Sequence, residues 1–274
     1  MPLFFRRKAD IAIVEVHGVI GSHVREPVYS RLFDNIARSR RHRALVVDIN
    51  SPGGSATASD LLYHNLKKVG RHKPVVAYVR GMSASGGYYL CCGATHVVSL
   101  PTALVGSIGV IYLRPILEQL LQRVGIEMSV YKGGRLKDMT GFWRSPTGEE
   151  SAKHQQLVGE MYDTFVDIVA SNRNLERDQV LELATGEVFT ARRARELGLV
   201  DEFGDFDRAL EIAAQRAGIP PRPRWVRPRR SLSDKLMGRG DSRRMDLGFL
   251  PIELPRLLAG GLYYIEPSLV TGDY

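Results

Sequence analysis

The stretch that decides the fold is Gly-Met-Ser-Ala-Ser-Gly-Gly-Tyr-Tyr, residues 81–89. It lies between an apolar run of strand type, residues 74–79, and a run of helix type that begins at Tyr88. Small residues and glycines at such a junction predict a sharp strand-to-helix corner that presents the hydroxyl of Ser85. The backbone N–H groups after the serine would point at the same spot, an arrangement that stabilises an oxyanion.

A serine hydroxyl is a weak nucleophile until a neighbouring base takes its proton. The sequence offers Lys137, within Tyr-Lys-Gly-Gly-Arg-Leu-Lys-Asp, residues 131–138. A lysine acts as a base only in its neutral form, and spacing alone does not distinguish Lys137 from Lys132. Serine and lysine together indicate acyl transfer, most simply peptide hydrolysis.

Strand-like and helix-like runs alternate over residues 10–131, and the pattern turns mostly helical from Thr147 onward. This order predicts an α/β fold with βαβ crossovers and a mostly parallel sheet buried on both faces. The expected strands are 11–16, 44–49, 74–79, 96–99, 108–112 and 126–131. The expected helices are 28–39, 57–69, 88–93, 114–124, 148–171, 177–184, 191–197 and 206–217.

A change of composition at Gly218 divides the chain into an N-terminal segment (1–9), a catalytic domain (10–218) and a tail (219–274). The tail is rich in Pro, Arg and Gly, which predicts partial disorder with short docking pieces. Its first part, residues 219–230, holds five arginines and no acid. We interpret this basic run as a solvated linker, with peripheral contact to anionic lipid as the alternative.

The composition is that of an ordinary globular chain of 274 residues, 44% hydrophobic and 25% charged. The formal net charge of +8 is mild and no recognition motif accompanies it, so we expect no nucleic-acid partner. Neither a secretory signal nor 18 uninterrupted apolar residues are present, so we expect a cytoplasmic protein or one peripheral to a membrane.

The cysteines and histidines predict neither a disulfide nor a metal site. Cys91 and Cys92 are adjacent within an apolar run, and neighbouring cysteines rarely bridge each other, so we expect two buried thiols. The seven histidines show no paired metal-ligand spacing, and no phosphate-loop or dinucleotide fingerprint occurs. We therefore expect no metal and no cofactor.

A second glycine corner, Asn-Ser-Pro-Gly-Gly-Ser at residues 50–55, follows the preceding buried-type strand. Gly53 and Gly54 allow positive φ and close approach of another backbone. The carboxyl ends of adjacent parallel strands meet at one edge of a sheet, where ligands bind. The two corners are therefore expected to form one site.

At this point the chain resembles the signal peptide peptidase A (SppA-type) serine peptidases. The matching blocks occur in the same order within residues 10–217: DINSPGG (48–54), GMSASGGYY (81–89), TALVGSIGV (102–110), KGGRLKD (132–138), and GEVFT (186–190) with GLVDEFG (198–204). The resemblance implies a ClpP/crotonase-like fold and a homo-oligomer whose subunits line a chamber. Compared with many members, the sequence is expected to lack an N-terminal membrane anchor and to hold one catalytic domain, not two.

Carried over residue by residue, the resemblance assigns a role to each motif. Ser85 becomes the nucleophile, Lys137 the general base, and Ser107 the hydroxyl that orients the lysine amine. Backbone N–H groups at Gly54 and Gly86 become the oxyanion donors, with Gly53 in the same turn.

The leading hypothesis is a serine endopeptidase that cleaves small, extended, largely apolar peptides such as signal-peptide remnants. An extended substrate would add as a strand beside residues 80–84 or 105–110. The expected substrate-contacting residues are Ser83, Ala84, Leu104, Val105 and Ile108.

Two other functional classes stay open at this stage: a crotonase-type acyl-CoA enzyme and a non-catalytic scaffold at a membrane surface. The destination of the tail is open too. Its apolar patches are expected to dock on a neighbouring subunit, with a membrane surface or the peptide groove as alternatives.

Overall fold

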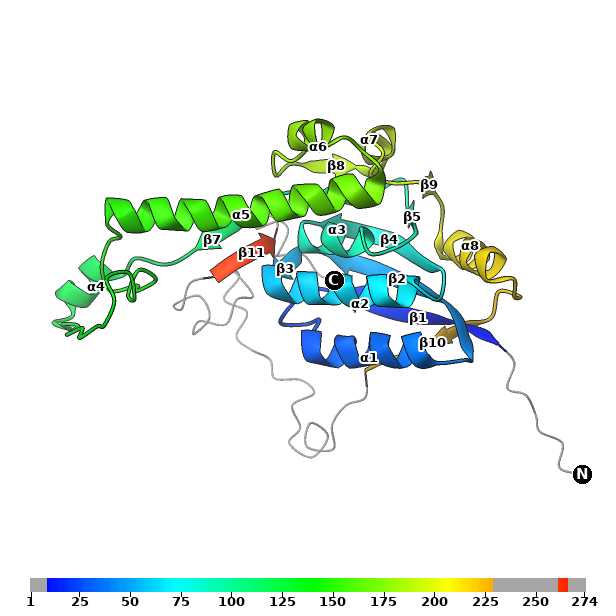
Figure 1. Ribbon diagram of the computed structural model, residues 1–274, viewed down its shortest axis with the longest axis horizontal. Helices are drawn as coiled ribbons and strands as arrows, with labels where there is room; N and C mark the ends of the chain where they lie inside the picture. Colours follow the sequence, from blue (N-terminus) through cyan, green and yellow to red (C-terminus); the bar gives the residue numbers. More distant parts are fainter. Residues whose placement is uncertain (1–8, 229–260, 266–274) are drawn as a thin grey trace, which may run out of the picture.

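The computed structural model describes residues 9–228 and 261–265. A twisted, mostly parallel sheet forms the middle layer, and helices cover both of its faces (Figure 1). The strands of this sheet follow the order β10-β1-β2-β4-β5-β9, while β6 pairs with β4 and β8 pairs with β6. Their bounds are β1 Asp10–His17, β2 His42–Ser51, β4 Val75–Ala84, β5 His96–Ser99, β6 Leu104–Gly106, β8 Val188–Thr190, β9 Glu202–Phe203 and β10 Pro223–Trp225.

The helices are α1 Glu26–Arg38, α2 Ala56–Gly70, α3 Gly86–Cys91, α4 Glu118–Arg123, α5 Gly148–Arg173, α6 Arg177–Leu183, α7 Ala191–Glu196 and α8 Phe206–Ala217. The alternation of side chains along β1 explains the two faces of the sheet. Val14 and Val16 point into the core shared with α1, α2, α3 and α5, whereas Ile11 and Ile13 point into the core shared with α8. The expected α/β fold is confirmed.

A second, three-stranded sheet lies beside the carboxyl edge of the first. It is antiparallel and has the order β3-β11-β7, with β3 Gly53–Ser55, β7 Ile111–Leu113 and β11 Gly261–Ile265. Its middle strand comes from the tail. A further piece of the tail, β10, pairs in parallel with β1. The tail therefore contributes one strand to each sheet, which its Pro-rich composition did not predict.

Two expected strands between residues 104 and 131 differ from the structure. The single strand expected at 108–112 is replaced by two short strands, β6 and β7. Gly106 and Ser107 have φ values of 113° and 50°, and these left-handed residues end β6. The strand expected at 126–131 is not formed, and Ile126, Met128 and Val130 are exposed.

Residues 114–147, hereafter the arm, extend past the body of the molecule below the N-terminal half of α5 (Figure 1). Arg114 anchors the arm: its guanidinium donates hydrogen bonds to the backbone carbonyls of Met139 (2.6 Å), Gly141 and Arg144 (2.7 Å). The Arg114 side chain thus holds the loop that leads into α5. None of the helices in residues 9–228 is both long and apolar enough to cross a bilayer.

Candidate active site

Ser85 occupies the predicted corner between β4 and α3. It has φ 52° and ψ −114°, a backbone conformation that a residue with a side chain rarely adopts. Its N–H donates to the Gly106 carbonyl at 2.7 Å, and its own carbonyl accepts from the Tyr89 N–H at 2.9 Å. Such strain persists only where surrounding contacts impose it, and it is concentrated at functional sites. The side chain of Ser85 is buried.

Ser107 lies next to Ser85 because β4 and β6 pair in parallel. The register places Ala84 opposite Gly106, so the following residue of each strand is a serine at the same edge. Ser107 is also buried and left-handed, and its N–H donates to the Glu187 carbonyl at 2.7 Å. The structure therefore brings together the two predicted serines.

Gly54 turns its backbone polar groups toward β11. The Ile20 N–H donates to the Gly53 carbonyl (2.8 Å), and the Ser55 N–H donates to the Ile20 carbonyl (2.9 Å). Backbone groups of successive residues in a strand face opposite sides, so the Gly54 N–H and carbonyl face β11. That strand pairs Tyr264 with Gly54.

Gly53 contributes space rather than a donor. Its N–H donates to the Ser51 hydroxyl at 3.1 Å. A Cβ at Gly53 would collide with the carbonyl oxygen of Tyr264 and lie 2.7 Å from the backbone nitrogen of Gly86. Gly53, Gly54 and Gly86 thus surround one carbonyl oxygen, that of Tyr264.

The five expected substrate-contacting residues do not form an exposed strand edge. Ser83, Ala84, Val105 and Ile108 are buried, and Leu104 is half-buried. A peptide cannot pair directly with residues 82–84, because Ser83 pairs with Ser51 of β2 on one side and residues 82–84 pair with β6 on the other. β6 is likewise paired on both sides. The strand edges that pair with an extended segment, β11, are those of β3 and β7.

Lys137 lies in the arm and is exposed. Its backbone N–H donates to the Gly134 carbonyl at 3.2 Å. In the part of the chain that the structure describes, its amine makes no hydrogen bond or ion pair. The rival Lys132 differs, because its amine forms an ion pair with Asp138. The Lys132 amine is thus engaged by a carboxylate of its own loop, which leaves Lys137 as the better candidate to reach a serine.

A network of charges ties this loop to the start of α5. The Arg144 guanidinium donates to both carboxylate oxygens of the buried Glu150, at 2.5 and 2.8 Å, and also contacts Asp138. Hydrogen bonds from Arg144, then from the Thr147 backbone, lower the pKa of Glu150 from its ordinary 4.5 to about 2. Lys132 and Arg144 likewise lower the pKa of Asp138.

Within one chain, the structure does not bring Lys137 and Ser85 together. The Lys137 loop is tied to the first turn of α5 through Glu150, whereas Phe165 of the same helix packs on Tyr89 of α3 (ring centroids 4.9 Å apart). Fifteen helical residues at about 1.5 Å each separate these two contacts by roughly 22 Å. Figure 1 shows the α4–α5 loop at the far end of α5 from α3.

Sequence reasoning did not single out the aromatic cluster beside the site. Tyr264 of β11 stacks on Tyr89 (ring centroids 5.0 Å, interplanar angle 21°) and packs on Phe165 (4.9 Å, 50°). The sequence feature that could have pointed to this cluster is the apolar segment at residues 262–265 of the tail. The structure places that segment against this chain's own β3 and β7, not on a neighbouring subunit as preferred from sequence.

Comparison with known proteins decides the family. The model of peptidase family S49 matches residues 67–220, more than half of the chain, and the Clp protease model matches residues 6–105. The chain belongs to peptidase family S49. It is an SppA-type S49 peptidase domain with a ClpP/crotonase-like fold, as the motifs predicted.

Several relatives of this S49 domain are proteases by name. It is 40% identical over 214 residues to a Synechocystis sp. protein described as a protease, covering 78% of this chain and 76% of that protein. It is 34% identical to the chloroplastic serine protease SPPA of Arabidopsis thaliana, covering 76% of this chain but 32% of the relative. A signal peptide peptidase SppA of Enterococcus faecium is 32% identical, with coverage of 73% and 62%. The chain thus spans only part of several longer relatives.

A solved structure, a mutant of the membrane-bound stomatin-specific protease 1510-N, shares the fold. The TM-score is 0.52 at 17% identity, and the match covers 81% of this chain and 99% of the other. At this level of identity the similarity concerns architecture alone.

Replacing Gly53 by alanine should abolish peptide hydrolysis while the domain stays folded. The new methyl group would occupy the space of the carbonyl that the site must accept, and positive φ at alanine costs about 1–2 kcal/mol. Gly218→Ala is the matched control, because Gly218 also has positive φ (63°) but open space where its methyl group would lie. Thermal unfolding should show a larger loss for Gly53→Ala, because its methyl group meets backbone atoms, with both variants still folded at the assay temperature. A peptide assay should show loss of activity only for Gly53→Ala. Full activity of Gly53→Ala would contradict this picture of the site.

The Arg144–Glu150 pair should make stability depend on pH in the acid range. The folded-state pKa of Glu150 lies below its ordinary value, so the stabilisation is complete above about pH 4.5 and is lost as pH falls through about 2. We expect Glu150→Gln to flatten part of the decline in melting temperature between about pH 5 and 2. Glu149→Gln, at the exposed neighbouring position, is the control. Parallel pH profiles for wild type and Glu150→Gln would contradict the assignment.

Proposed function

We propose that this chain is a serine endopeptidase in which Ser85 attacks the peptide carbonyl and Lys137 serves as the general base. One observation carries the proposal. The strained Ser85 corner and the backbone of Gly54 and Gly86 surround the carbonyl oxygen of an extended strand, at the position where a substrate carbonyl would lie.

The proposed reaction follows from these groups. The neutral amine of Lys137 accepts the hydroxyl proton as Ser85 Oγ bonds to the substrate carbonyl carbon. The N–H groups of Gly54 and Gly86 stabilise the resulting oxyanion. The lysine then gives its proton to the departing amine, which leaves an ester on Ser85. A water molecule, deprotonated by the same lysine, hydrolyses that ester. Ser107, beside Ser85, is suited to hold the lysine amine in place.

Within one copy, the loop of Lys137 is tied to the first turn of α5, whereas Ser85 precedes α3, which packs on the other half of that helix. We therefore propose that the base comes from a second copy of the chain. The arm that carries Lys137 has the surface of an interface. It exposes seven large apolar side chains, and Tyr131 among them is 94% exposed: Ile116, Leu120, Val124, Ile126, Met128, Val130 and Tyr131. Apolar patches of this kind mark contact surfaces.

The segment at residues 126–131 supports the same conclusion. Its alternating apolar residues predicted a strand, yet it has no strand partner among the described residues. A sequence of strand type without a partner is suited to pair when another copy packs against the arm. We therefore propose a homo-oligomer in which each arm completes the site of its neighbour.

The proposed substrates are extended, largely apolar peptides. The site accepts a strand between β3 and β7, and backbone pairing of this kind recognises an extended chain with little regard to its sequence. Signal-peptide remnants fit this class, in line with the name of the Enterococcus relative.

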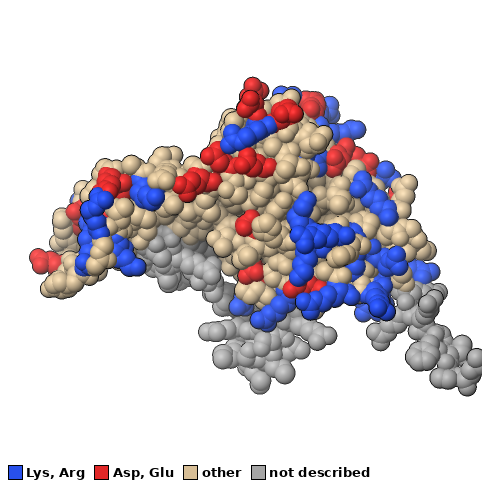
Figure 2. Space-filling model, viewed as in Figure 1, with Lys and Arg blue, Asp and Glu red and all other residues tan. Residues whose placement is uncertain are grey.

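Peripheral contact with an anionic membrane remains a prediction for the basic run. Part of that run is described, and Arg227 forms an ion pair with Glu15 at 3.6 Å. Lys and Arg side chains also gather over α1 and α2 (Figure 2), so positive charge is not confined to the tail. Neither acyl-CoA chemistry nor a purely structural role has an observation in its favour, and membership in a peptidase family argues against both.

Mixing two inactive variants tests both the dyad and its division between copies. Ser85→Ala and Lys137→Ala should each lose at least about 1000-fold in kcat/KM for a peptide ester, as loss of a nucleophile or its base commonly does. Dissociation and reassembly of the two variants together should restore about a quarter of the sites, since each restored site pairs an intact serine with an intact neighbouring lysine.

The control is each variant carried alone through the same dissociation and reassembly. Full activity of Lys137→Ala alone would overturn the role of the lysine. Failure of the mixture to recover activity, with heteromers demonstrated by mass, would overturn the division between copies.

Charges placed on the arm should disrupt the assembly and the activity together. Leu120→Glu and Met128→Glu put charge where an apolar interface is proposed, so light scattering should show a smaller particle and hydrolysis should fall in proportion. Trp225→Gln changes an exposed apolar residue on β10 and should leave particle mass and activity unchanged. A monomeric wild type with full activity would contradict the proposal.

A further inference from the structure

The tail strand β11 lies where a peptide substrate would lie. It runs antiparallel to β3, with Tyr263 opposite Ser55, Tyr264 opposite Gly54 and Ile265 opposite Gly53. On its other side it pairs with β7 over residues 261–263. One short segment of the same chain therefore uses both edges of the groove, and a second strand cannot occupy them at the same time.

The side chain of Tyr264 anchors this strand in an aromatic pocket. It is 2% exposed, stacks on Tyr89 and packs on Phe165, and its hydroxyl donates to the Met161 carbonyl at 3.1 Å. Burial raises the pKa of Tyr264, so the phenol keeps the proton that it donates.

The pocket itself is held by contacts that do not involve the tail. The Tyr89 hydroxyl donates to Asp60 at 2.8 Å, and the Tyr89 ring meets Tyr63 edge to face at 5.4 Å. Phe165 is fully buried in the central core. Tyr89 and Phe165 therefore form a pocket for an aromatic ring, whether β11 or a bound peptide supplies that ring.

The carbonyl of Tyr264 defines the register of the strand relative to Ser85. Its oxygen lies against Gly53 and Gly86, the residues that surround the proposed oxyanion position. Tyr264 therefore takes the place of the residue whose carbonyl Ser85 would attack, and its side chain fills the pocket for that residue.

Resting on the peptidase function proposed above, we propose that β11 is an internal competitor of substrate, and that the Tyr89–Phe165 pocket selects an aromatic side chain at the residue before the cleaved bond. A peptide binds only when β11 has left the groove. Its apparent affinity is then its affinity for the open groove multiplied by the fraction of molecules in which the groove is open.

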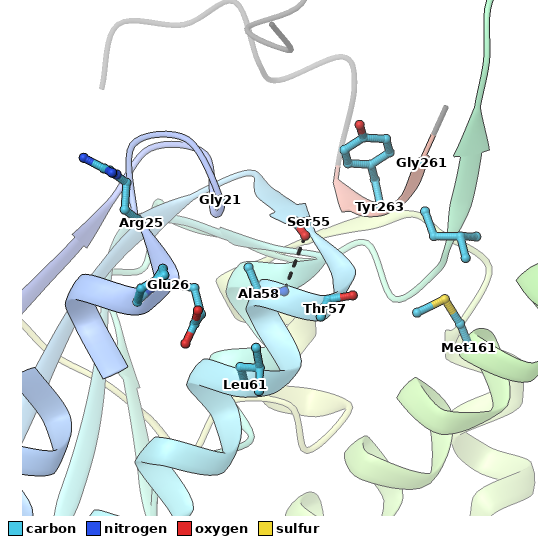
Figure 3. Close-up of a pocket in the computed structure, with 12 residues that line it drawn as sticks. Gly21, Arg25, Glu26, Ser55, Thr57, Ala58, Leu61, Met161, Gly261 and Tyr263 are labelled. Atoms are coloured by element: carbon cyan, nitrogen blue, oxygen red, sulfur yellow. Dashed lines mark hydrogen bonds between the residues drawn. The ribbon is translucent and has the colours of Figure 1, made fainter. Parts of the chain in front are cut away.

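A neighbouring cavity shows that β11 does not fill all of the space beside the groove. It measures about 620 Å³ and is bounded by the starts of α1 and α2, by Met161 and by residues 261–263. Figure 3 shows Leu61 from α2 and Met161 from α5 beside this cavity, with Tyr263 above it. Because Leu61 is exposed there, a substrate with a bulky apolar residue upstream of the aromatic one gains contacts that β11 does not make.

The test measures peptide binding in the full-length chain without catalysis. A fluorescent nonapeptide with the sequence of residues 259–267, Ala-Gly-Gly-Leu-Tyr-Tyr-Ile-Glu-Pro, is titrated by anisotropy into Ser85→Ala and into Ser85→Ala/Tyr264→Ala. Removal of a buried aromatic anchor should open the groove, so the peptide should bind the double variant about tenfold more tightly or better. Ser85→Ala/Tyr264→Phe keeps the ring and should bind like Ser85→Ala.

Two further outcomes decide the proposal. Replacing the second tyrosine of the peptide, which corresponds to Tyr264, by alanine should abolish tight binding to the double variant. Replacing the first, which corresponds to Tyr263, should matter less. Equal affinities of the first two proteins for the parent peptide, with both folded by circular dichroism, would overturn the internal competitor. Equal affinity of the double variant for the parent peptide and for the peptide without the second tyrosine would overturn the proposed aromatic pocket.

Because binding is measured without Ser85, these results do not depend on whether the chain hydrolyses peptides. In the active protein, Tyr264→Ala should lower the KM for a peptide with an aromatic residue before the cleaved bond and leave kcat unchanged. An unchanged KM with normal hydrolysis would overturn the competitor while the peptidase function stands.

Discussion

The hydrogen bond from the Ser85 N–H to the Gly106 carbonyl is the contact on which the site depends. It extends the β4–β6 register by one residue past the end of β4 and holds Ser85 in a left-handed conformation that it would not adopt alone. The same register sets Ser107 beside Ser85. The buried strands on either side supply the rigidity, since a corner at the end of a single flexible loop would relax.

The long helix α5 separates the two residues that we propose for the dyad. Its C-terminal half is buried through Phe165 against the site, and its first turn holds the loop that carries Lys137. A rigid helix of 26 residues prevents that loop from folding back onto its own Ser85. Under the proposed division of the dyad between copies, activity would be confined to the assembled protein.

The three-stranded sheet explains how an open groove is kept covered. Exposed strand edges such as β3 and β7 invite pairing with other chains. The strand β11 covers both edges and buries Tyr264 in the aromatic pocket. Protection of the edges and control of access to Ser85 are thus provided by the same short strand.

The sequence by itself determined the parallel α/β core, the Ser85 and Gly53–Gly54 corners and the family, because these depend on residues close together along the chain. Strand alternation and glycine position act locally, and they predicted β1, β2, β4 and most helices. Tertiary structure alone decided that Lys137 lies far from its own Ser85 and that Tyr264 reaches the groove. Both depend on contacts between segments far apart in the chain or at the two ends of a long helix, and no local pattern encodes which segments meet.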